Sequence, residues 1–206
     1  VSSLTSSGMS MKTHLRHILS IGLLFLSLLG SGGAWAADCP NNSYTLSTQG
    51  QVDAFPQDCD RVPGNITVEG GGSAEPIVNL DALANLTSVG GNLTLNANAS
   101  LTSINGLANL TSLGGGLDIT SNSSLTSIDA LANLTSVGGD LYITSNSSLT
   151  NLDALASLTS VGGGLYIRSN GSLTSLDGLA NITSVGGGLD ITNNVSLPSI
   201  DALANL

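Results

Sequence analysis

The chain has 206 residues, of which 14 are acidic and only four are basic, for a net charge of −10. Lys12 and Arg16 lie near the start, so residues 37–206 carry 14 acidic side chains against two arginines, a net charge near −12. A surface of this sign repels phosphate groups, which disfavours nucleic acids, anionic membranes and polyanionic glycans as partners.

Residues 1–36 have the pattern of an export signal. Lys12 and Arg16 form a positive segment, and residues 18–29 are an apolar run. That run is shorter than the roughly 20 residues of a membrane span, which disfavours the alternative of a transmembrane anchor. Residues 34–36 (Ala-Trp-Ala) supply a small-x-small cleavage pattern. We therefore expect export to the periplasm, the outer surface or the medium, with no membrane span in the visible chain.

The only two cysteines are Cys39 and Cys59. An even pair in an exported protein predicts a disulfide. A metal site would need histidines or further cysteines, and both histidines precede residue 37. We expect a Cys39–Cys59 bridge within an N-terminal cap that covers residues 37–68.

The hexapeptide GGxLxI recurs every 24 residues, at 114–119, 138–143, 162–167 and 186–191, and GGNLTL holds the same place at 90–95. Around it, residues 85–206 follow the consensus NLTSVGGxLxITSNxSLTSIDALA through five complete units and the start of a sixth. A period of this length is typical of solenoids. We expect residues 69–206 to stack as 24-residue coils, and we expect the solenoid to be truncated at the C-terminus.

Each unit contains one clear strand pattern. Leu117 and Ile119 alternate with Asp118, which predicts a strand with one buried face. The other apolar residues are spaced as in corners and short strands, and no run is long enough for a conventional helix. One unit buries too little apolar surface to offset the entropy of ordering its backbone, so a coil is stable only in a stack. We predict an all-β solenoid.

Glycines and asparagines each occupy fixed positions in the coil. The paired glycines, such as Gly114 and Gly115, are predicted to form corners with positive φ, the alternative being close approach of a ligand to the backbone. Five asparagines are predicted to stack as an internal ladder that bonds the backbone and the neighbouring coil. These asparagines are Asn98, Asn122, Asn146, Asn170 and Asn194.

A column of aspartates occupies another fixed position, with Asn105 in the remaining coil. Its members are Asp81, Asp129, Asp153, Asp177 and Asp201. We expect each to cap a turn, because asparagine caps as well as aspartate and Asn105 brings no charge. A calcium-binding column is the alternative. On the capping interpretation the chain needs no metal and no cofactor.

The pattern LxIxxNxxLxxI resembles the leucine-rich-repeat class. Leu149 follows Asn146 by three positions instead of two, a departure that is similar to the receptor L-domain branch. Cys59 ahead of GNITV at 64–68 resembles the start of such domains. The resemblance covers residues 39–206 and implies a right-handed single-stranded β-helix, with only general binding or adhesion as its function.

One position per strand is expected to point outward between the two buried residues. It holds Thr94, Asp118, Tyr142, Tyr166 and Asp190. Tyr142 and Tyr166 would stack on adjacent coils with Arg168 nearby, and exposed tyrosines and arginines suit binding surfaces. Ordinary cross-strand packing is the alternative. We expect Asp118, Tyr142, Tyr166, Arg168 and Asp190 to bind a protein or carbohydrate.

Catalysis is disfavoured by the residue types that are present. Residues 37–206 contain no histidine and no lysine, and both cysteines are assigned to a disulfide, so nucleophilic triads and proton shuttles lack their parts. We expect a non-catalytic recognition or adhesion module. An ice-binding surface and a structural spacer are the alternatives, although aspartate and tyrosine interrupt any flat threonine array.

Overall fold

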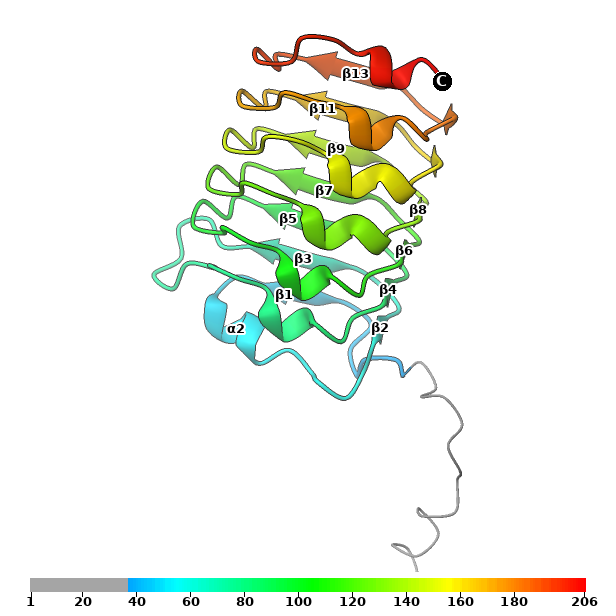
Figure 1. The fold of residues 1–206 in the computed structure, drawn as a ribbon. Coiled ribbons are helices and arrows are strands. Elements are labelled where there is room, and N and C mark those ends of the chain that lie inside the picture. The colour runs from blue at the N-terminus through cyan, green and yellow to red at the C-terminus, as the bar shows by residue number, and fades with distance from the viewer. Residues whose placement is uncertain (1–36) are drawn as a thin grey trace, which may run out of the picture. The chain divides into compact units, whose positions relative to one another are not determined.

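The structure is a computed structural model that describes residues 37–206, and the export signal expected over residues 1–36 lies outside them. The described chain winds into coils that stack on one another (Figure 1). Successive coils pair strand by strand into two parallel sheets. The prediction of a repeat solenoid is therefore confirmed.

The longer strands form a seven-stranded parallel sheet in the order of the chain. They are β1 (Tyr44–Leu46), β3 (Ile66–Glu69), β5 (Leu93–Asn96), β7 (Leu117–Thr120), β9 (Leu141–Thr144), β11 (Leu165–Arg168) and β13 (Leu189–Thr192). Leu117 lies opposite Leu141, which lies opposite Leu165. The 24-residue period of the sequence is thus the register of the sheet.

Two-residue strands form a second, six-stranded parallel sheet. They are β2 (Arg61–Val62), β4 (Ser88–Val89), β6 (Ser112–Leu113), β8 (Ser136–Val137), β10 (Ser160–Val161) and β12 (Ser184–Val185). A short 3₁₀ helix, which the sequence pattern did not predict, completes each coil after the first. These helices are η1 (Asp81–Leu83), η2 (Asn105–Leu107), η3 (Asp129–Asn133), η4 (Asp153–Ser157), η5 (Asp177–Leu179) and η6 (Asp201–Leu203).

The N-terminal segment continues the same architecture. β1 pairs with β3 and β2 pairs with β4, so residues 37–68 extend both sheets. The five-residue helix α2 (Gln49–Asp53) buries Val52 against this end. A disulfide joins Cys39 to Cys59, as the sequence predicted. The covalent link and the short helix close the first coil.

Reduction of the Cys39–Cys59 disulfide is expected to lower the free energy of unfolding by about 3 kcal/mol. The bridge closes a loop with a sequence separation of 20 residues, and opening it restores chain entropy to the unfolded state. Urea unfolding of the full chain with and without reductant measures the difference. The double variant Cys39→Ala with Cys59→Ala is the control, because its curve should not respond to reductant. Coincident curves for the wild-type chain would refute the expectation.

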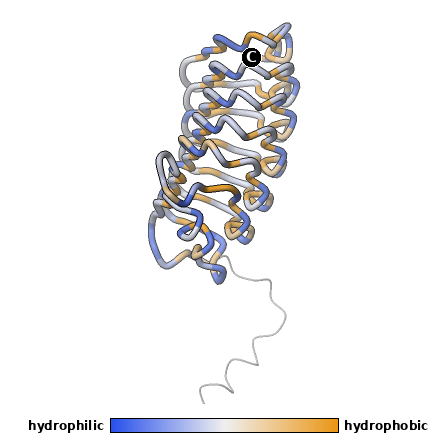
Figure 2. The backbone as a smooth tube through the Cα atoms, turned by 90° about the vertical axis from the view of Figure 1, so that its left-hand side faces the viewer, coloured by the Kyte–Doolittle hydropathy of each residue, from blue (hydrophilic) through white to orange (hydrophobic). Residues whose placement is uncertain are grey.

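Aliphatic side chains fill the interior of every coil. Leu117 and Ile119 of β7 are fully buried, as are the matching residues of β9 and β11. Figure 2 shows hydrophobic stretches recurring along the stack of coils. The last coil has a neighbour on one side only, and its Leu189 is 52% exposed whereas Leu165 at the same position is 0% exposed. Burial of these side chains therefore comes from stacking.

The paired glycines bring adjacent coils into close contact. A Cβ added at Gly138 would lie 2.9 Å from the carbonyl carbon of Gly114 and closer still to its oxygen. None of the paired glycines has a positive φ, so the prediction of positive-φ corners is wrong. That conformation occurs instead just before the ladder asparagines, at Ala97, Ser121, Ser145, Ser169 and Asn193. Glycine is required in the pairs because a side chain would collide with the neighbouring backbone.

The five asparagines of the expected ladder lie one above another, and four of them are buried. The backbone N–H of Asn146 donates to Oδ1 of Asn170 at 3.0 Å, and its Nδ2 donates to the Ile119 carbonyl at 2.7 Å. Its own Oδ1 accepts the backbone N–H of Asn122 at 3.0 Å. The buried amide of Asn146 therefore satisfies two backbone groups of the preceding coil, and the amide of the following coil satisfies its own N–H.

The aspartate column does not cap the turns as expected. No hydrogen bond to these five carboxylates is found within residues 37–206, and each aspartate is the first residue of its 3₁₀ helix rather than the cap. The N–H of Asp129 instead donates to Ser127 Oγ at 2.9 Å, and that of Asp153 to Asn151 Oδ1 at 3.1 Å. The prediction was wrong because the acceptor belongs to the residue two positions earlier. No cluster of three metal-ligating side chains occurs in the described chain.

A second column of asparagines, on the outside, was missed by the sequence analysis. Nδ2 of Asn133 donates to the Ala108 carbonyl at 2.8 Å, across to the preceding coil. Asn109 and Asn181 make the same contact at 2.7 and 2.9 Å, and Ser157 replaces the amide with its hydroxyl. The signal was present, since these positions define the start of every repeat.

Candidate functional site

The outer face of the seven-stranded sheet brings four of the five predicted binding residues into one row. Asp118 lies opposite Tyr142, Tyr142 opposite Tyr166, and Tyr166 opposite Asp190. Arg168 belongs to the next row, two residues further along β11. Because side chains alternate along a strand, these groups share the face away from the buried leucines.

Tyr142 and Tyr166 form a stack on this face. Their ring centroids are 4.5 Å apart and their planes differ by 11°. The guanidinium carbon of Arg168 lies 4.8 Å from the Tyr166 ring centroid. Nη2 of Arg168 lies 2.7 Å from Oδ2 of Asp190, which comes from the next coil. Four of the five predicted residues therefore form one contiguous cluster across β9, β11 and β13.

The Asp190 carboxylate makes the stability of the folded chain depend on pH. The Thr192 hydroxyl and then the Arg168 guanidinium hold the pKa of the Asp190 carboxyl below its usual value. Because the pKa of Asp190 is lower in the folded chain than in the unfolded chain, its charge stabilises the fold at pH values above the unfolded pKa of about 3.9. This contribution is lost as the pH falls through the pKa of the folded state.

We therefore expect Asp190→Asn to reduce the urea midpoint at neutral pH. The difference from the wild-type chain should shrink as the pH is lowered from about 5 to about 2. Urea midpoints of both proteins across that range measure the effect. A difference that stays constant with pH would contradict the role of the carboxylate charge.

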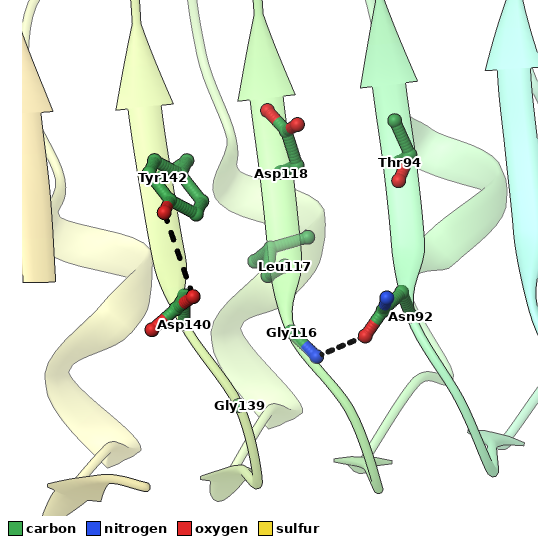
Figure 3. A pocket seen from close by; sticks show the side chains of 8 residues that line it. All are labelled: Asn92, Thr94, Gly116, Leu117, Asp118, Gly139, Asp140 and Tyr142. Carbon is green, nitrogen blue, oxygen red and sulfur yellow. Dashed lines mark hydrogen bonds between the residues drawn. The ribbon is translucent and has the colours of Figure 1, made fainter. Parts of the chain in front are cut away.

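A hollow of about 240 Å³ lies beside the tyrosine stack, over β5, β7 and β9 (Figure 3). Its lining consists of Asn92, Thr94, Gly116, Leu117, Asp118, Gly139, Asp140 and Tyr142. Gly116 contributes no side chain, and the Asp118 carboxylate accepts a hydrogen bond from the Thr120 hydroxyl. At the equivalent Gly164 the ring of Tyr166 occupies the space where a Cβ would be. The hollow exists because strand β7 carries Asp118 at the position where strand β11 carries Tyr166.

Asp140 is the one charged residue lining this hollow that was not predicted as a binding residue. Its Oδ1 accepts the Gly164 N–H at 2.6 Å, and the Tyr142 hydroxyl donates to its Oδ2 at 3.5 Å. Asn92 holds the same place two coils earlier, where its Oδ1 accepts the Gly116 N–H at 2.7 Å. Burial, and after it the charge of Asp140, raises the pKa of the Tyr142 hydroxyl. Tyr142 therefore stays protonated and donates to the carboxylate.

Neither a protein-family model, nor a curated protein, nor a solved structure matches the chain. Among residues 37–206, no helix has the length and apolar character needed to cross a bilayer. The site must therefore be interpreted from its own chemistry.

Proposed function

We propose that residues 37–206 are a non-catalytic, exported recognition or adhesion module that binds a protein or glycan on the outer face of the seven-stranded sheet. The proposed type is the receptor L-domain branch of the leucine-rich-repeat class. The winding we propose is right-handed, as crossovers between parallel strands almost always are. The disulfide between Cys39 and Cys59 supports export, because such bonds persist in oxidising compartments.

The observation that carries the proposal is the stack of Tyr142 and Tyr166 beside a hollow on an otherwise regular surface. Planar aromatic rings with an adjacent arginine are the groups that dominate binding energy at interfaces. The outer asparagine column, by contrast, is engaged between coils, as Asn109 and Asn133 illustrate. The sheet face is thus where the chain departs from its repeat and presents unusual side chains.

Ice binding is less well supported by these contacts. A regular threonine column runs along the coils at the position of Thr111 and Thr135. The hydroxyl of Thr135 donates to the Thr111 carbonyl at 3.1 Å, and that of Thr111 donates to the Thr87 carbonyl at 3.1 Å. Hydroxyls engaged with the neighbouring backbone are not available to organise a water lattice.

Screening the full chain against glycan and peptide arrays tests the proposal. A ligand bound by the wild-type chain should be lost by Tyr142→Ala with Tyr166→Ala, because both rings leave the sheet face. The pair Asp129→Ala with Asp153→Ala, on two 3₁₀ helices, is the control and should bind normally. Unchanged binding by the tyrosine variant, or loss in the control alone, would move the site off the sheet face.

A further inference from the structure

The hollow beside Tyr142 contains two carboxylates without a cation from the chain. Oδ1 of Asp118 and Oδ1 of Asp140 each accept one hydrogen bond from the protein. The ion pairs of residues 37–206 are Arg61 with Asp38 and Arg168 with Asp190. This part of the chain has no other arginine and no lysine, so neither aspartate in the hollow has a basic partner within it.

The neighbouring coils show how this surface accommodates a guanidinium. Arg168 lies over the Tyr166 ring while its nitrogens bond Asp190 on the adjacent strand at 2.7 and 2.8 Å. Tyr142 has a similar environment on its other side, because the hollow that it lines also contains Asp118 on the adjacent strand β7. The Asp140 carboxylate adds a second negative group below the ring (Figure 3).

We propose that the hollow binds the guanidinium group of an arginine side chain from a protein partner. This inference rests on the proposed recognition function and names its ligand class. The planar cation stacks on the exposed side of Tyr142 and donates hydrogen bonds to Asp118 and Asp140. A guanidinium suits the site better than an ammonium because it is planar, stacks on aromatic rings and presents several donors at fixed angles.

Size and charge agree with this ligand. Pockets for drug-sized molecules occupy about 300–1,000 Å³, so a hollow of about 240 Å³ suits a single side chain. The net charge near −12 from 14 acidic residues and two arginines attracts a basic partner over a longer range. Binding should therefore weaken as ionic strength rises.

Titration of the purified full chain with Nα-acetyl-arginine amide, followed by NMR, tests the proposal. The citrulline analogue, which keeps the shape and loses the charge, is the matched probe. We expect the arginine probe to shift the Tyr142 ring signals saturably and the citrulline probe not to do so. Equal binding of both probes, or no shift with the arginine probe, would overturn the proposal.

Two isosteric variants locate the cation. Asp118→Asn and Asp140→Asn should each weaken binding of the arginine probe by about three- to tenfold. Asp140→Asn copies Asn92, which already fills the same position, so the fold is retained. Asp129→Asn, on η3, is the control and should bind as the wild type does. Unchanged affinity in both hollow variants would overturn the assignment.

Methyl β-glucoside separates the failure of this inference from the failure of the proposed function. If the sugar shifts the Tyr142 ring and the arginine probe does not, the guanidinium assignment is wrong and the sheet face remains a recognition surface. If array ligands still bind after both tyrosines are replaced, the site lies elsewhere and both proposals fail.

Discussion

Replacing Asn146 with alanine is expected to lower the free energy of unfolding by about 3–5 kcal/mol. The side chain is 0% exposed, accepts the Asn122 N–H and donates to the Ile119 carbonyl. Alanine would leave both backbone groups buried without partners, and each such group costs about 1–3 kcal/mol. Urea unfolding of the full chain measures the loss.

Asn133→Ala is the matched control for this measurement. Asn133 also bridges two coils, through its bond of 2.8 Å to Ala108, but it is exposed and water can replace the lost partner. We expect a loss of about 1 kcal/mol or less. Equal losses in the two variants would show that burial of the internal ladder does not determine its contribution.

Replacing Gly138 with alanine is expected to cost about 3 kcal/mol or more. The new Cβ would overlap the carbonyl group of Gly114, and backbone atoms cannot move aside as a flexible side chain can. The same peptide region also holds the coils together, since the Gly138 N–H donates to the Leu113 carbonyl at 3.0 Å. Thermal and urea unfolding report the change.

Gly171→Ala is the matched control, and we expect it to raise the stability of the chain. No atom lies within 4 Å of a Cβ built at Gly171, so alanine fits and restricts the unfolded chain. We expect a gain of about 0.4–1 kcal/mol. If Gly138→Ala proved as harmless as Gly171→Ala, close approach of the coils would not explain the glycine pairs.

The repeating coil could be predicted because its cause is periodic. A strand at Leu117–Thr120 and the register of 24 residues follow from apolar alternation that recurs unchanged. The short helices could not be predicted, since their DALAN-like sequences are three to five residues long and give no helical period. The glycine pairs were misinterpreted because close contact with the next coil leaves no trace in the local sequence.

The candidate site was predictable in part for the same reason. The outward row of Asp118, Tyr142, Tyr166 and Asp190 followed from strand alternation. The hollow could not be predicted from that alternation, because it depends on the side chains that lie next to Gly116 in the folded chain. Asp140 was missed since its contact partner Gly164 becomes a neighbour only when the coils stack.

Different positions of the repeat hold the interior together and form the outer surface of the sheet. Buried asparagines and contacting glycines recur in almost every coil, where each satisfies its neighbours. The outward strand position holds Thr94, Asp118 and Tyr142 in successive coils, and each of these side chains is only partly buried. The outward side chains can therefore differ between coils without disturbing the interior.

Mapping of backbone amide shifts over the full chain during titration with Nα-acetyl-arginine amide tests the proposed recognition surface most directly. We expect the largest changes on the exposed residues of β7 and β9, around Asp118 and Tyr142. Changes concentrated on the 3₁₀ helices η3 and η4, with β7 and β9 unaffected, would contradict a recognition surface on the seven-stranded sheet.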